Sequence, residues 1–95
     1  MLPNFLQSAL WSYNLKSVKK NFHKKIIITQ ILNYGTWPQI QWLLKNYSSK
    51  EIKEVLKNPD RGVWQADVIN YWKKIFNIRL PKKKVDKALF SLYAK

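Results

Sequence analysis

The chain has 95 residues, 46% of them hydrophobic, and this size leaves room for one hydrophobic core. It contains no cysteine, which excludes disulfide scaffolds, thiolate zinc sites and cysteine nucleophiles. Eighteen Lys and Arg stand against five Asp and Glu, so the formal net charge is +13, and a surface this basic attracts polyanions and acidic proteins.

Helical periodicity extends through nearly the whole chain, and no segment shows the strict apolar–polar alternation of a strand. No run approaches the roughly 20 apolar residues of a membrane span. We therefore predict a cytoplasmic all-α protein, a compact bundle of about five short helices in a single domain. It would comprise an irregular N-terminal arm (1–14), a helical core (15–78) and a basic C-terminal helix (79–95).

The arm begins without the basic residues and the continuous apolar stretch of a signal peptide. We expect a short helix or turn over residues 4–10. The first core helix is predicted over residues 16–34, with Gly35 in the left-handed conformation that ends many helices. The next helix begins at Thr36, which forms a capping box with Gln39.

A second capping box, Ser48 with Glu51, predicts the start of a short helix. The turn-forming composition of residues 58–62 predicts a loop before a helix over residues 63–76. Pro81 marks the start of the terminal helix.

Apolar side chains repeat at helical spacing in each of these segments. Trp64 and Trp72 fall on such a stripe, and Trp37 is expected to make a structural contact at a helix start. The predicted inward-facing residues are Phe22, Ile26, Ile27, Leu32, Ile40, Leu43, Leu44, Tyr47, Ile52, Val55, Leu56, Trp64, Val68, Trp72, Ile75, Val85, Leu89 and Leu92.

No catalytic constellation is present in the sequence. The only histidine, His23, lies in a basic helical segment, where a surface or boundary position is expected. The five acids are scattered, apart from Glu51 and Glu54, which belong to a cap and a helix face. We predict a protein that is not an enzyme and that needs no metal and no cofactor.

The lysines of the first core helix form a pattern. Lys16, Lys20 and Lys24 recur every four residues, so one helical face would carry these three charges, with Lys19 and Lys25 beside it. Like charges at this spacing repel by about 0.2–0.5 kcal/mol per pair, and a bound anion would relieve that repulsion. An ordinary solvated face explains the pattern equally well.

Residues 73–87 form the most basic segment, and we favour it as the main polyanion contact. Its lysines at the start of the last helix oppose the helix dipole but are well placed to hold phosphate. The segment has one acid, Asp86, and these seven basic residues: Lys73, Lys74, Arg79, Lys82, Lys83, Lys84 and Lys87.

A helix-turn-helix is a sharper hypothesis, with residues 37–45 as the supporting helix and 49–57 as the reading helix. Lys50, Lys53 and Lys57 would form its outward stripe. Lysines grip phosphates and do not read base edges, so the binding would be weakly sequence-specific. The polar side of the following helix, with Asn70 and Asn77, competes for this role, and an ordinary helical hairpin is the alternative.

Three aromatic residues lie off the predicted core stripes. Trp11 and Tyr13 are in an irregular segment, and Trp42 lies beside the apolar line of its helix, where burial is also expected. Exposed rings of this kind stack on bases or anchor a protein interface.

Three runs carry a resemblance to a known family: HKKIIITQILNYGTWPQIQWLLKNYS from His23 to Ser48, IKEVL at residues 52–56 and NYWKKIFNI at residues 70–78. They resemble a family of small bacterial helical domains of unknown function, over roughly residues 11–78. Members are often encoded beside nucleotidyltransferase-type toxins of abortive-infection systems. The resemblance implies an antitoxin-like or defence-associated role and brings no catalytic residues.

Two functions remain from the sequence. In the first, which we favour, the lysines bind DNA or RNA. In the second, the protein binds an acidic protein partner such as a cognate toxin, with Trp11, Tyr13 and Trp42 as anchors and the lysines steering encounter.

Overall fold

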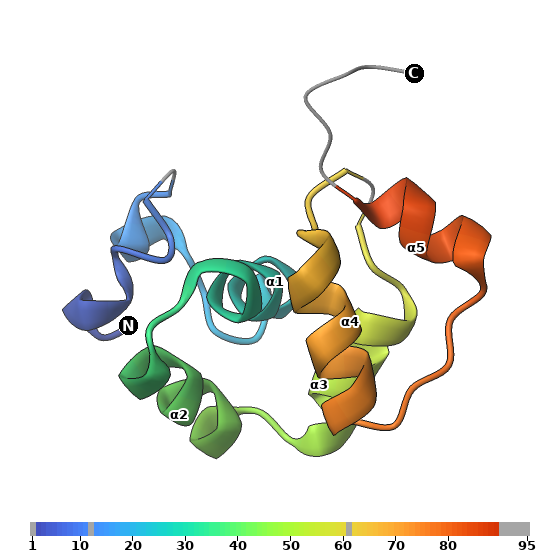
Figure 1. Cartoon of the computed structure of the whole chain (residues 1–95). Helices are drawn as coiled ribbons and strands as arrows, with labels where there is room; N and C mark the ends of the chain where they lie inside the picture. The colour runs from blue at the N-terminus through green and yellow to red at the C-terminus, as the bar shows by residue number, and fades with distance from the viewer. Residues whose placement is uncertain (1, 12, 61, 90–95) are drawn as a thin grey trace. The chain divides into compact units, whose positions relative to one another are not determined.

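Helices account for the regular structure of the chain, as the periodicity predicts, in a computed structural model that describes residues 2–11, 13–60 and 62–89 (Figure 1). The backbone divides into two compact units, Met1–Ser48 and Ser49–Lys95. The first holds two 3-10 helices, Asn4–Leu6 and Leu15–Ser17, and helices α1 (Lys24–Tyr34) and α2 (Trp37–Asn46). The second holds α3 (Ser49–Lys57), α4 (Ala66–Ile75) and α5 (Lys82–Ala88). The all-α fold class is confirmed, whereas the single domain with its three parts stays a prediction.

The helix predicted over residues 16–34 is wrong in its first half. The side chain of Asn14 accepts a hydrogen bond from the Lys16 N–H at 3.1 Å, which favours a tight 3-10 turn. Val18 then takes an extended conformation, with φ −89° and ψ 123°, and buries its side chain. His23 holds the next turn, because its Nδ1 accepts the Lys19 N–H at 2.9 Å. Only from Lys24 onward does the chain become α-helical.

The predicted left-handed conformation of Gly35 is also wrong, since its φ of −73° and ψ of 149° are extended. The residue is confined by close packing instead. Its N–H donates to the Ile31 carbonyl oxygen at 2.7 Å. A Cβ at this position would lie 2.5 Å from that oxygen and 2.9 Å from Ile31 Cγ2, so a side chain would force α1 and the following turn apart.

Gly35→Asn is therefore expected to lower the free energy of unfolding by about 1–3 kcal/mol, the usual cost of overpacking. Gly62→Asn is the matched control, because Gly62 has a φ of 75° with no atom near its Cβ position. Asn tolerates that left-handed backbone, so the control is expected to cost under about 1 kcal/mol. Urea unfolding measures both. An equal cost at the two glycines would contradict the steric argument.

The capping box at Thr36 and Gln39 is confirmed, and the Thr36 N–H donates to Gln39 Oε1 at 2.8 Å. The same Gln39 side chain is buried and also holds the N-terminal arm. Its Nε2 donates to the Phe5 carbonyl at 2.6 Å and to Ser8 Oγ at 2.7 Å. The arm is thus part of the first unit, and its apolar side chains Leu2, Leu6, Ala9 and Leu10 are buried.

Of the 18 predicted inward-facing residues, nine are buried and five are half-buried, whereas Leu44, Ile75 and Phe22 are exposed, Phe22 by 82%. Trp37, which was expected to make a structural contact, is 62% exposed. Phe22 lies before the start of α1, so the helical spacing that predicted its burial does not apply. In α4 the fully buried position is Ile69, beside the buried Trp72 that was predicted.

In the second unit, backbone hydrogen bonds join the C-terminal end of α5 to the loop before α4. The Gly62 N–H donates to the Lys87 carbonyl at 2.9 Å, and the Trp64 N–H donates to the Ala88 carbonyl at 2.8 Å. Trp64 and Leu89 form an isolated parallel bridge, and the Trp64 side chain is fully buried. The predicted start of α5 after Pro81 is confirmed, and its predicted core residue Leu92 lies outside the described residues.

Asn77 ends α4 in a left-handed conformation, with a φ of 53°. Its N–H donates to the Lys74 carbonyl at 3.2 Å, and the Ile78 N–H donates to the Lys73 carbonyl at 2.8 Å. This is the hydrogen-bond pattern of a Schellman motif, in which Asn is the usual substitute for glycine. The buried Ile78 completes it with an apolar contact position.

Candidate nucleic-acid interface

The described residues contain no cluster of metal ligands. Among residues 2–11, 13–60 and 62–89, no group of three or more His, Cys, Asp and Glu could hold a metal ion. No helix found in those residues has the length and apolar character needed to cross a membrane. His23 is half-buried, which agrees with the expected boundary position, and its Nδ1 accepts the Lys19 N–H.

The first unit is basic and free of acids. Residues 1–48 contain six of the 18 basic residues and none of the five acids. All six lysines are exposed: Lys16, Lys19, Lys20, Lys24, Lys25 and Lys45.

These lysines do not form the predicted helical stripe. Lys16 lies in the 3-10 helix, Lys19 and Lys20 lie in the connection to α1, and Lys24 and Lys25 open α1. Lys20 is held in place by Tyr47, because its Nζ lies 5.7 Å from the centroid of that ring. The Tyr47 hydroxyl donates to the Lys20 carbonyl at 2.7 Å, which fixes the backbone as well.

The helices of the proposed helix-turn-helix are present, but α2 belongs to the first unit and α3 to the second. The motif therefore stays a prediction. On α3 the buried side chains are Ile52, Val55 and Leu56. Lys50 and Lys57 are exposed and Lys53 is half-buried, so two of the three lysines are fully available to a ligand.

A hollow lies beside the C-terminal half of α4. Its volume is about 300 Å³, and it is lined by Asn70, Lys73, Lys74, Asn77 and Ile78. The residues that the sequence placed on the polar side of this helix thus line one hollow. Two ammonium groups with two side-chain amides suit a phosphate or a carboxylate.

The remaining basic residues of the 73–87 segment, Arg79, Lys82, Lys83, Lys84 and Lys87, are exposed. The predicted phosphate site at the start of the last helix is weakened by the structure. The helix has only seven residues, and the Lys84 N–H already donates to the Pro81 carbonyl at 3.0 Å. These lysines are accordingly separate point charges on the surface.

Aromatic exposure was the main feature that sequence reasoning underestimated. Trp11 is 56% exposed and makes an edge-to-face contact with Tyr34, the ring centroids being 4.7 Å apart. Phe22 was assigned to the interior and Trp37 to a structural contact at a helix start, yet both are exposed. Trp42 is half-buried and contacts the Tyr47 ring edge-on at 6.1 Å, as its mixed assignment allowed.

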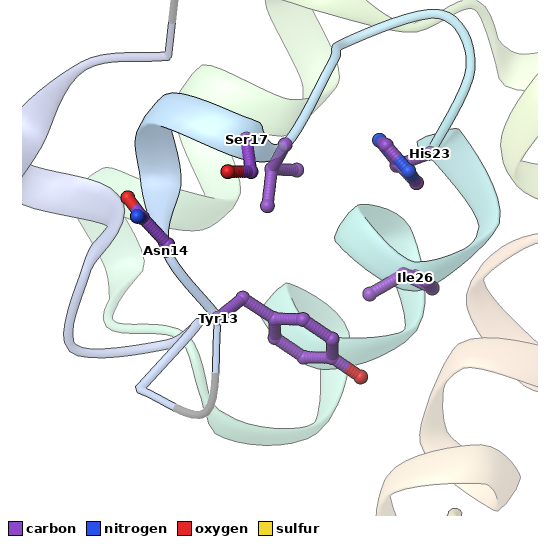
Figure 2. A pocket seen from close by; sticks show the side chains of 6 residues that line it. Tyr13, Asn14, Ser17, His23 and Ile26 are labelled. Carbon is purple, nitrogen blue, oxygen red and sulfur yellow. The ribbon is translucent and has the colours of Figure 1, made fainter.

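A pocket in the first unit brings together residues that the sequence left unrelated. Tyr13, Asn14, Ser17, Val18, His23 and Ile26 line a volume of about 190 Å³. Figure 2 shows Tyr13 and His23 on different sides of this space, with Asn14 and Ser17 along its rim. The lining residues come from the irregular segment, the 3-10 helix and the start of α1. No spacing rule connects such positions, since their proximity depends on the turn at residues 18–23.

Comparison with known proteins gives one match. A family model described as a family of unknown function, DUF6922, matches residues 5–56. No curated protein and no solved structure matches the chain significantly.

Proposed function

The chain belongs to DUF6922, a family of unknown function, and from its surface we propose that it is a non-catalytic nucleic-acid-binding protein. The observation that carries the proposal is the acid-free first unit with its six exposed lysines. A polyanion is the ligand that such a surface attracts most strongly.

The physical basis is the release of counterions. Each phosphate that a lysine neutralises frees condensed cations, so affinity falls with salt by about 0.9 in log–log slope per contact on duplex DNA and about 0.7 on single strands. In the second unit, the α4 hollow offers Lys73 and Lys74, with Asn70 and Asn77 as hydrogen-bonding groups. Both units therefore have groups that hold phosphate.

A biological context follows from the resemblance noted in the sequence. Small helical proteins encoded beside nucleotidyltransferase-type toxins suggest an antitoxin-like role in bacterial defence. Binding of nucleic acid fits that role, because an antitoxin that binds DNA can regulate its own expression. We propose this context together with a cytoplasmic location.

The test is a salt titration of binding, from about 50 to 300 mM, with fluorescent single-stranded RNA, single-stranded DNA and duplex DNA. Two triple variants remove equal charge from the two units: Lys16→Gln with Lys19→Gln and Lys20→Gln, and Lys82→Gln with Lys83→Gln and Lys84→Gln. Each is expected to weaken binding to all sequences alike and to reduce the slope by about 0.7–0.9 for every phosphate that the variant no longer neutralises.

Equal charge makes the two variants controls for each other, because a pure effect of net charge would change both slopes by the same amount. An unequal change locates the main contact. Affinity that vanishes above about 100 mM salt would reject the proposed function, as would slopes that neither variant changes.

An acidic protein partner is the second candidate function, and the exposure of Trp11 beside Tyr34 favours it. Aromatic rings anchor protein interfaces, and the surrounding lysines would accelerate encounter with an acidic surface. Tyr13 is a further anchor on the same unit, whereas the half-buried Trp42 offers less of its ring. If the protein binds no nucleic acid at physiological salt, binding of an acidic protein becomes the favoured function.

A further inference from the structure

The pocket at Tyr13 and His23 has the size of one ring system. Pockets for drug-sized ligands measure roughly 300–1,000 Å³. This one measures about 190 Å³, which is too small for a whole nucleotide or a cofactor and sufficient for a single flat heterocycle. Most of its lining surface is apolar, as stacking requires.

The walls of the pocket are held in place by the protein itself. Asn14 caps the 3-10 helix through the Lys16 N–H, and the Val18 N–H donates to the Leu15 carbonyl at 3.2 Å. On the other side, the backbone of His23 donates to the Lys19 carbonyl at 2.8 Å while its ring accepts the Lys19 N–H. A preformed cavity binds its ligand without an ordering cost.

The chemistry of the lining suits a nucleobase. Tyr13 and His23 supply two aromatic rings, with Val18 and Ile26 as apolar surface between the elements (Figure 2). Because Nδ1 of His23 accepts a hydrogen bond, the neutral imidazole carries its proton on Nε2. That N–H is a donor, and the Asn14 and Ser17 side chains add polar groups to the rim.

Lysines that neighbour the lining residues in sequence would attract the phosphates of a nucleic acid. Lys16 lies between the lining residues Asn14 and Ser17, and Lys19 and Lys20 lie between Val18 and His23. All three lysines are exposed, and no acid occurs in residues 1–48. A base in the pocket would place its flanking phosphates among these ammonium groups.

We infer that this pocket binds one unpaired base of single-stranded RNA or DNA, an inference that rests on the proposed function. The base enters between Tyr13 and His23, and the strand runs over the lysines on either side. A duplex keeps its bases stacked and paired, so it would have to unstack one base at a cost of a few kcal/mol to use the pocket. Single strands are thus the preferred ligands of the first unit.

The experiment compares strands that carry bases with a strand that lacks them. The probes are fluorescent oligo(dT) and oligo(rU) of about 12 nucleotides, and an abasic strand with the same number of phosphates. At physiological salt the wild-type protein is expected to bind the base-bearing strands about tenfold more tightly than the abasic strand, the usual effect of a stacked base. Oligo(dU), which has the base of oligo(rU) on the sugar of oligo(dT), then shows whether the pocket prefers DNA or RNA.

Substitutions in the pocket are expected to remove this difference while leaving the salt slope unchanged, because they leave every lysine in place. Tyr13→Ala removes the stacking ring, and Tyr13→Phe keeps it and should restore binding. His23→Asn removes the second ring and retains an acceptor for the Lys19 N–H, so the wall should stay folded. Tyr71→Ala, at an exposed tyrosine of the second unit, is the matched control.

The outcomes separate the two proposals. Equal affinity of the wild-type protein for base-bearing and abasic strands overturns the pocket assignment and leaves nucleic-acid binding in place. Failure to bind any strand at physiological salt overturns both. The first comparison needs no variant, so equal affinities would overturn the pocket assignment even if a substitution prevents folding, whereas a preference for bases is assigned to the pocket by the Tyr13 and His23 variants.

Discussion

Trp64→Ala is expected to lower the free energy of unfolding by about 3–5 kcal/mol, the largest effect of any single truncation in this chain. Trp64 is the largest fully buried side chain among the described residues, with 0% exposure. Its loss leaves a cavity under the bridge to Leu89, where the chain beyond α5 pairs with the loop before α4. Small proteins are stable by about 5–15 kcal/mol, so this substitution removes a large fraction of the total.

Two further variants isolate the cause, and urea unfolding followed by circular dichroism measures all three. Trp37→Ala truncates an exposed tryptophan and is expected to change stability by less than about 1 kcal/mol. Trp64→Phe should cost about 1 kcal/mol, because the Trp64 Nε1–H is buried without an acceptor among the described residues. A Trp64→Ala protein as stable as Trp37→Ala would contradict the burial of this residue.

Gln39→Ala is expected to cost about 2–4 kcal/mol, since one buried side chain makes three hydrogen bonds. The substitution removes the Gln39 half of the α2 capping box and releases the arm at Phe5 and Ser8. Hydrogen exchange should therefore show loss of protection in the arm as well as in the first turn of α2. Thermal unfolding gives the change in stability.

The matched control is Gln41→Ala on the same helix, where the glutamine is exposed and the change should stay within about 0.5 kcal/mol. Gln39→Glu separates the two roles of the side chain. A carboxylate can still accept the Thr36 N–H, but it cannot donate to the Phe5 carbonyl, so the arm should be released while the cap remains. Unchanged protection of the arm in Gln39→Glu would show that the arm is held by apolar packing alone.

Sequence reasoning succeeded where the physics is local. The Thr36–Gln39 cap, the helix from Ser49 and the start after Pro81 depend on residues within one helical turn of each other. It failed over residues 16–23, where helical spacing is present but side chains compete with the helix for backbone groups. The Asn14 oxygen and the His23 ring each take an N–H that a continuous helix would have used.

The same difference explains which parts of the candidate site were predictable. The polar side of α4 lies on one helix, so Asn70, Lys73 and Lys74 could be placed together from their spacing alone. Tyr13 and His23 line the same pocket only because of the unpredicted turn between them. Gly35 shows the limit again, since the close approach of its Cα to Ile31 cannot be inferred from the glycine itself.

The pairing of α3 with α4 bears on how this family can diverge. The family match ends at Leu56, one residue before the end of α3, whereas Ile52, Val55 and Leu56 are buried in a unit where α3 packs against α4. The matched residues thus include nearly all of α3, whereas α4, which packs against it, lies outside the match. A relative with a different downstream sequence would still have to cover these three side chains. Its charges could change freely, and with them its ligand, but it would have to supply an apolar helix face or an equivalent surface in the same place.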